Sequence, residues 1–123
     1  MPKELLDLPF LTFLSIAYNN FSGPIPNELG NLKELYLMSF GVNHFSGTLP
    51  PELGNLVKHE QLYINSCGLG GEIPSTFANP ENLQVVVASD SPFTGKIPNF
   101  VGNNWKKCHI IVIHQNILVI IFI

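Results

Sequence analysis

Charged residues are scarce in this sequence, and those present do not cluster. Only 12% of the 123 residues are charged, about half the usual share in globular proteins, whereas 46% are hydrophobic. Six lysines face nine acidic residues, giving a formal net charge of −3, and Lys106-Lys107 is the one basic pair. Because nucleic-acid binders concentrate positive charge on one surface, we expect no nucleic-acid partner.

Motifs that mark catalysis or metal binding are also missing. The sequence has two cysteines without a CxxC pair, and none of its four histidines lies in an HExxH context. The glycine-rich run at 68–72, GLGGE, could suggest a phosphate loop, but it is in phase with the repeat described below. We therefore predict a protein that is not an enzyme, with no catalytic residue, no metal site and no cofactor.

Strong hydrophobicity over a long segment is confined to the C-terminal end. The stretch IIVIHQNILVIIFI at 110–123 is short and is interrupted by polar residues at 114–116. A membrane-spanning helix needs about 20 apolar residues, and the opening MPKELLDLPF lacks the apolar core of a signal peptide. We expect neither a transmembrane helix nor a signal peptide in this chain.

The main feature present is a segment that recurs at a fixed interval. NNFSGPIPNELGNL begins at Asn19 and returns as NHFSGTLPPELGNL at Asn43. Shorter versions, CGLGGEIP and SPFTGKIP, follow at Cys67 and Ser91, each after the same step along the chain. A fixed period of this length is typical of solenoids, in which each repeat is one coil that is stable only when stacked on its neighbours.

Each period also contains the pattern Leu-x-x-Leu-x-Leu-x-x-Asn or close substitutes. Its Leu-x-Leu part predicts a short strand with one buried face, and stacked strands predict a parallel sheet. We expect the last position to form a structural ladder, in which each polar side chain bonds backbone groups of the adjacent coil. The ladder residues are Asn19, Asn43, Cys67, Ser91 and Asn116, the last after one extra residue at 103–104.

Two irregular positions follow from this register. His59 stands where a buried leucine is expected, so we interpret it as a core residue and not as a metal ligand. Cys67 and Cys108 would lie two coils apart, about 9–10 Å, which exceeds the ~7 Å Cα separation that a disulfide allows. We predict two free, buried thiols and no disulfide.

The unit LxxLxLxxNxFSGxIPxELGNLxx resembles the plant-type leucine-rich repeat over residues 2–118. The stretch IPSTFANPENLQVVVASDSPFTGKIPNFVGNNW is further similar to leucine-rich-repeat receptor-like serine/threonine kinases whose ectodomains also carry a malectin-like domain. The resemblance implies an α/β solenoid, a right-handed leucine-rich repeat of about five 24-residue coils. Its parallel β-sheet would form the concave face, its convex face would contain 3₁₀ turns and irregular backbone, and the Gly-x-Ile-Pro run would add a second set of short strands.

The same resemblance implies a non-catalytic recognition module. It would be a fragment of a plant receptor-like kinase ectodomain that binds a peptide, a glycan or a co-receptor for signalling at the extracellular face of the plasma membrane. Contact with the membrane would come only through other parts of the parent receptor. Two alternatives stay open: a soluble secreted inhibitor of the polygalacturonase-inhibitor type, or a truncated fragment without function.

The ends of the chain depart from the family pattern. We see no paired-cysteine cap, and none of the HRD, DFG or glycine-rich motifs of a kinase. We predict a leucine-rich-repeat array at 1–118, cut from a longer ectodomain, followed at 119–123 by an apolar tail that is not family sequence.

The register also predicts which residues point outward from the strands. Polar and aromatic residues among them are our candidates for ligand contact on the concave face, since tyrosine gives a large contact area at low entropy cost. These candidates are Tyr18, Tyr63, Asn65, Ser66, Asp90 and Gln115. Separately, Asn20-Phe21-Ser22 is an acceptor tripeptide for N-glycosylation, which makes Asn20 a candidate modification site.

Overall fold

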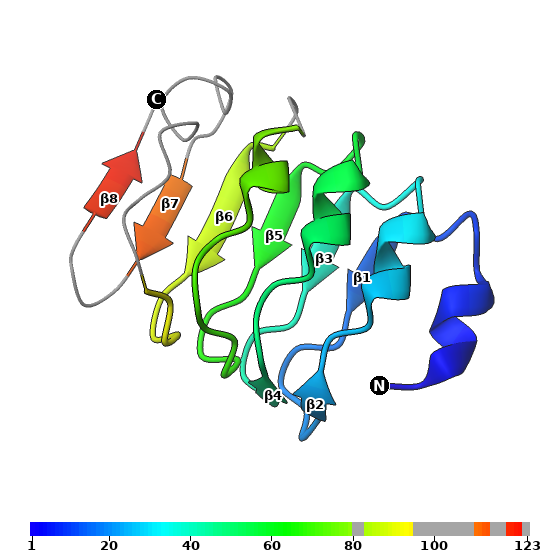
Figure 1. Cartoon of the computed structure of the whole chain (residues 1–123), viewed down its shortest axis with the longest axis horizontal. Helices are drawn as coiled ribbons and strands as arrows, with labels where there is room; N and C mark the ends of the chain where they lie inside the picture. The colour runs from blue at the N-terminus through cyan, green and yellow to red at the C-terminus, as the bar shows by residue number, and fades with distance from the viewer. Residues whose placement is uncertain (80–82, 95–109, 114–117, 122–123) are drawn as a thin grey trace.

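The computed structural model describes residues 1–79 and 83–94, together with the backbone of 110–113 and 118–121. The strands of successive coils lie side by side in one sheet. Short 3₁₀ helices stack next to one another on the opposite side of the coils (Figure 1). The parallel strands are β1 (Phe13–Ser15), β3 (Leu37–Ser39), β5 (Gln61–Tyr63), β6 (Val85–Ala88) and β7 (Ile110–Ile113). The 3₁₀ helices are η1 (Lys3–Asp7), η2 (Asn27–Asn31), η3 (Pro51–Asn55) and η4 (Ser75–Ala78). This arrangement confirms the leucine-rich-repeat solenoid predicted from the sequence.

The pairing of the main sheet follows the repeat. Phe13 is opposite Leu37, and Leu37 is opposite Gln61, so that paired residues stand exactly one repeat period apart in the sequence. Val85 is opposite Ile110, one position more than a period, which accommodates the one extra residue at 103–104. Equal intervals place each apolar side chain directly over its counterpart, and this is what a continuous core requires.

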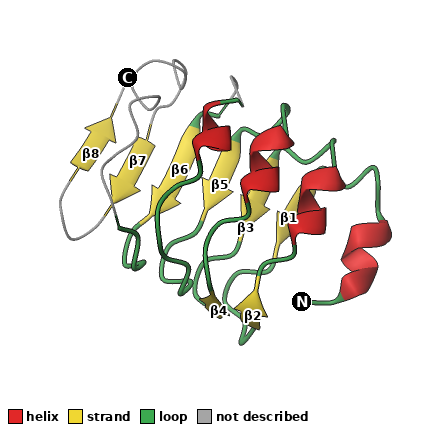
Figure 2. Cartoon of the chain, in the orientation of Figure 1, coloured by secondary structure: helices red, strands yellow, loops and turns green. Residues whose placement is uncertain are grey.

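A second, two-stranded sheet lies along one side of the solenoid. Its strands, β2 (Ser22–Pro24) and β4 (His44–Ser46), pair in parallel with Ser22 opposite His44 (Figure 2). The step from Ser22 to His44 is two positions shorter than the repeat period, so this sheet is staggered relative to the main one. Gly23 and Gly47, with φ of 81° and 79°, let the chain bend at this point through a left-handed conformation that would be strained for a residue with a side chain.

Residues 118–121 form a further strand, β8 (Leu118–Ile121), at the edge of the main sheet. It runs antiparallel to β7, with Ile113 opposite Leu118. The repeat pattern predicts only an apolar tail at 119–123 and gives no sign of this reversal. The domain boundary at residue 118 stays a prediction.

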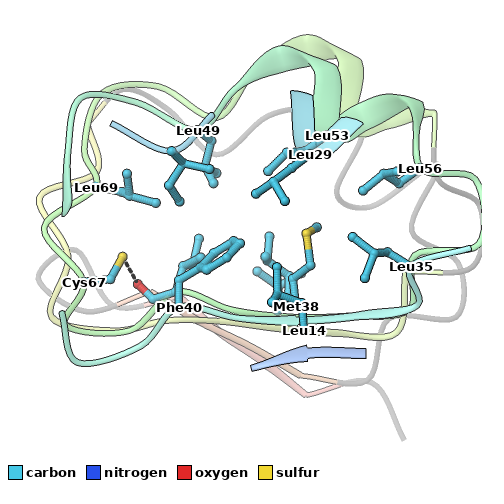
Figure 3. Close-up of a cluster of buried hydrophobic side chains, with 14 of the residues drawn as sticks. Leu14, Leu29, Leu35, Met38, Phe40, Leu49, Leu53, Leu56, Cys67 and Leu69 are labelled. Carbon is cyan, nitrogen blue, oxygen red and sulfur yellow. Dashed lines mark hydrogen bonds between the residues drawn. The ribbon is translucent and has the colours of Figure 1, made fainter. Parts of the chain in front are cut away.

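The core lies between the main sheet and the 3₁₀ helices. Leu29 and Leu53 point inward from η2 and η3, toward Leu14 and Met38 from the strands (Figure 3). Their side chains are between 0% and 4% exposed. Each coil thus contributes one layer of leucine-type side chains to the core. Burial of each such side chain stabilises the fold by about 1.5–3 kcal/mol.

Candidate functional site

The side chains that leave the core on the sheet side form columns, because the strands are paired in register. One column contains Phe13, Leu37, Gln61 and Val85, and the next contains Ser15, Ser39, Tyr63 and Val87. All eight are exposed or half-buried, whereas the residues between them in each strand are buried. We call this surface the outer sheet face.

Asn43 supports this face from inside the turn that follows β3. Its amide nitrogen donates to Ile16 O of the first coil at 3.0 Å and to Phe40 O of its own coil at 2.8 Å. Its amide oxygen accepts the backbone N–H of Phe21 at 3.1 Å. One side chain, 6% exposed, therefore ties two coils together and satisfies backbone groups that no strand partner reaches.

The other ladder residues that the structure describes make fewer side-chain hydrogen bonds than Asn43. Asn19 donates only within its own coil, to Ile16 O and Ala17 O. In the third and fourth coils, Cys67 Sγ and Ser91 Oγ both donate to Ile64 O, at 3.0 and 2.7 Å. Burial raises the pKa of the Cys67 thiol, so the sulfur stays protonated and acts as a weak donor.

The residue before each of the four described ladder positions adopts a left-handed backbone conformation. Tyr18, Val42, Ser66 and Asp90 have φ between 51° and 56°. The first three donate their backbone N–H to the next coil, as in Val42 N to Asn65 O at 3.0 Å. This feature was not predicted from the sequence, because tyrosine and valine rarely adopt such a conformation and only Asp90 is of a residue type that favours it.

The predicted contact residues are not all equally accessible. Tyr18 is 82% exposed and Asp90 is also exposed, whereas Tyr63, Asn65 and Ser66 are half-buried. Gln115, like the ladder residue Asn116, lies outside the described residues.

Four of these residues come together on two adjacent coils. Tyr63, Asn65 and Ser66 belong to the third coil, and Ser66 N donates to Ser89 O at 2.9 Å, which brings Asp90 of the fourth coil alongside. The Tyr63 hydroxyl donates to Gln61 Oε1 at 3.1 Å, and small Ser39 is its partner on the neighbouring strand. Tyr18 is two coils away, about 10 Å, and does not join this group.

His59 is fully buried beneath the same third coil. Its Nε2 lies 3.0 Å from Gln61 O, while Nδ1 has no hydrogen-bond partner. Desolvation lowers the pKa of His59 from 6.5 to about 4, although the bond to Gln61 acts in the opposite direction. The imidazole is therefore neutral at physiological pH and occupies a core position.

Two further observations concern the described part of the chain. Within it, no cluster of three or more His, Cys, Asp or Glu side chains has the arrangement of a metal site. Among the same residues, no helix has the length and hydrophobicity required to span a membrane.

The model of the family named Leucine Rich Repeat matches residues 10–32, 31–56 and 60–80, together more than half of the chain. This chain belongs to the leucine-rich-repeat family. No protein with a curated description matches the leucine-rich-repeat chain by sequence.

Solved structures of plant receptor ectodomains resemble this leucine-rich-repeat chain closely. The plant peptide hormone receptor RGFR1 in complex with RGF2 is 34% identical over 92% of the chain, with a TM-score of 0.87. The ectodomain of the Arabidopsis thaliana receptor kinase GASSHO1/SCHENGEN3, in complex with CASPARIAN STRIP INTEGRITY FACTOR 2, is 32% identical over 92%, with a TM-score of 0.85. The Arabidopsis HAESA ectodomain with an IDA peptide is 29% identical over 93%, with a TM-score of 0.87.

The leucine-rich-repeat chain covers only a small part of those ectodomains: 18% of the RGFR1 chain, 14% of the GASSHO1/SCHENGEN3 chain and 19% of the HAESA chain. The chain is thus a plant-type leucine-rich repeat that resembles receptor-like kinase ectodomains, as its sequence indicates. The narrower resemblance, to receptors that also carry a malectin-like domain, stays a prediction.

Proposed function

We propose that this chain is a recognition segment of a plant receptor-like kinase ectodomain, and that it binds a peptide or a partner ectodomain through its outer sheet face. The parent receptor would place it at the extracellular face of the plasma membrane. Support comes from the similar structures, which include RGFR1 with RGF2 and HAESA with the peptide hormone IDA and the co-receptor SERK1. These ligands were found with those proteins, and the extension to this chain is our proposal.

The observation that carries the proposal is the group of Tyr63, Asn65, Ser66 and Asp90 on two adjacent coils. Strand pairing and inter-coil hydrogen bonds fix the backbone that carries these side chains before any partner arrives. A preorganised surface loses less conformational entropy on binding, and a half-buried tyrosine offers both an apolar ring and a polar hydroxyl. An extended peptide crossing the strands could contact both coils.

The test measures binding of defined peptides to the wild-type chain and to surface variants. The probes are RGF2, IDA and peptides selected against the wild-type chain from a displayed library of random short sequences. Tyr63→Ala should weaken binding about tenfold or more, the typical effect of removing a central aromatic anchor. Asn55→Ala, on the exposed side of η3, is the matched control and should leave the affinity unchanged. Binding that survives Tyr63→Ala but is lost in Asn55→Ala would contradict the proposed face.

A further inference from the structure

We infer that Asn65 is a specificity-determining residue, whose side-chain amide pairs with the main-chain N–H and C=O of one residue of an extended peptide. Because proline has no main-chain N–H, the peptide residue at this point can be any residue except proline. The inference rests on the recognition role proposed above and adds a ligand class to it.

The side chain of Asn65 lies across Gly41 of the preceding coil. A Cβ built on Gly41 would stand 2.7 Å from Asn65 Oδ1 and 3.2 Å from Asn65 Cγ, so the amide occupies the space that a side chain at Gly41 would need. Gly41 is buried and Asn65 is half-buried. The amide is therefore packed against the backbone of the second coil and does not extend freely from the turn after β5.

The amide of Asn65 is not engaged within the described part of the chain. Among residues 1–79 and 83–94, no hydrogen bond reaches it, whereas buried Asn43 uses both the nitrogen and the oxygen of its amide. The backbone of Asn65 is engaged, since its carbonyl accepts the N–H of Val42 at 3.0 Å. A primary amide offers donors on its nitrogen and an acceptor on its oxygen, which complement the C=O and N–H of a peptide main chain. Packing thus positions this side chain and leaves it available for such pairing.

Within the described coils, this amide is particular to the third one. The same position of the repeat holds Ala17, Gly41 and Ser89 in the other described coils. None of these residues has an amide, and a larger residue at Gly41 would displace Asn65. A main chain that lies along this column can approach Asn65 without meeting a large side chain on either neighbouring coil. Asn65 would therefore fix the register of a peptide on the outer sheet face.

The test uses the tightest-binding library peptide selected against the wild-type chain, synthesised in versions that each carry one N-methyl group on the main chain. At least one version should bind the wild-type chain about tenfold more weakly than the unmethylated peptide, because it leaves the Asn65 amide without a donor. With Asn65→Ser the same methyl group should cost less than about threefold, since no amide remains to lose a partner. Serine stands at this position in the next coil, so the variant should fold.

Asn55→Ser is the matched control, the same substitution at an exposed asparagine of η3. It should keep the wild-type response to every methylated version. If each N-methyl group costs as much affinity with Asn65→Ser as with the wild type, Asn65 does not bind the main chain and the inference is wrong.

Gly41→Ala moves the amide of Asn65 without removing it. The φ of Gly41 is not positive, and the added methyl group meets chiefly the end of a side chain, which can rotate away, so the fold should be retained. Binding of the unmethylated library peptide should fall about fivefold or more in Gly41→Ala, and combining it with Asn65→Ser should cause no further loss. Thermal unfolding of each variant checks that the coils remain folded. Additive losses in the double variant would overturn the inference.

The outcome separates this inference from the proposed function. Loss of the library peptide in Tyr63→Ala, with an unchanged response to N-methylation in Asn65→Ser, would leave the proposed face in place and overturn the role of Asn65 alone. Absence of peptide binding to the wild-type chain would overturn both.

Discussion

His59 occupies, in the third coil, the core position that Leu35 holds in the second. Its folded-state pKa of about 4 lies below the ordinary value of 6.5, so between these values the unfolded chain binds a proton that the folded chain refuses. The free energy of unfolding should therefore fall as the pH drops from 6.5 to 4, by about 3 kcal/mol in total. Urea denaturation followed by circular dichroism across this range measures the effect.

Substitution of His59 separates its contribution from those of other titrating groups. His59→Leu restores the leucine of the repeat, so it should raise stability at every pH and remove most of the slope between pH 4 and 6.5. His44→Gln is the control, because His44 is exposed and its replacement should leave the slope in place. If the free energy of unfolding depends on pH in the same way in the wild type and in His59→Leu, His59 is not the cause of the pH dependence.

Val42 has a φ of 55°, a conformation that is costly for a β-branched residue. Asparagine tolerates this region better, so Val42→Asn should raise the free energy of unfolding by up to about 1 kcal/mol. Val57→Asn is the matched control at an exposed valine whose φ is not positive, and it should not stabilise the chain. Thermal unfolding of both variants tests this prediction. Equal changes in the unfolding temperature of Val42→Asn and Val57→Asn would show that the substitution at Val42 relieves no strain.

His59 and Val42 differ in what the sequence alone could predict. The burial of His59 was predictable because its place in the repeat register fixes which way its side chain points. The strain at Val42 was not, since its conformation is imposed by the hydrogen bond from its N–H to Asn65 O and by the turn into the ladder. Such constraints come from the neighbouring coil and leave no trace in the identity of the residue.

Contact between stacked 3₁₀ helices limits how far apart adjacent coils can lie. A Cβ added to Gly30 in η2 would lie 2.6 Å from the carbonyl oxygen of Glu52 in η3. Because that oxygen belongs to the backbone, it cannot rotate away, and Gly30→Ala should cost about 1–3 kcal/mol of stability. Asn31→Ala, at an exposed position of the same helix, should change stability by less than about 0.5 kcal/mol. Chemical denaturation that finds equal effects would contradict close packing of η2 on η3.

The pairing of some strands could be predicted from the sequence, whereas that of others could not. The repeat period gives the pairing of β1, β3 and β5 directly, because identical apolar positions must stack. The shorter step between β2 and β4 was not predictable, since β2 has no apolar side chain to set against the buried Phe45 of β4 and so nothing in its pattern fixes the register. The positions of Tyr63, Asn65, Ser66 and Asp90 on adjacent coils follow from the repeat, but their unequal exposure depends on turn geometry.

For the molecule as a whole, the reversal between β7 and β8 marks the limit of repeat-based reasoning. The repeat predicts the position of each parallel strand from the matching residues of the preceding coil. Leu118–Ile121, which pairs antiparallel with β7, has no counterpart in the repeat. Four consecutive apolar residues contain no alternation, so their direction and partner cannot be read from the pattern.

Stability should vary along the solenoid, because each coil gains its core contacts only from its neighbours. Leu5, Leu11 and Ile16 of the first coil are half-buried, whereas their second-coil counterparts Leu29, Leu35 and Phe40 are 0% exposed. Native-state hydrogen exchange should therefore find the slowest amides in the second and third coils and faster exchange in the first, through local opening of that coil.

Paired substitutions provide an independent check of the same gradient. Leu35→Ala removes a fully buried side chain and should cost about 2–5 kcal/mol, whereas Leu11→Ala, one coil earlier at the same position of the repeat, should cost clearly less. Equal losses, together with uniform exchange across both coils, would mean that the array opens as a single unit. A larger loss at Leu35 with slow exchange in β3 and β5 would show that the interior coils hold the edge coil in place, because only coils packed on both sides bury their leucines completely.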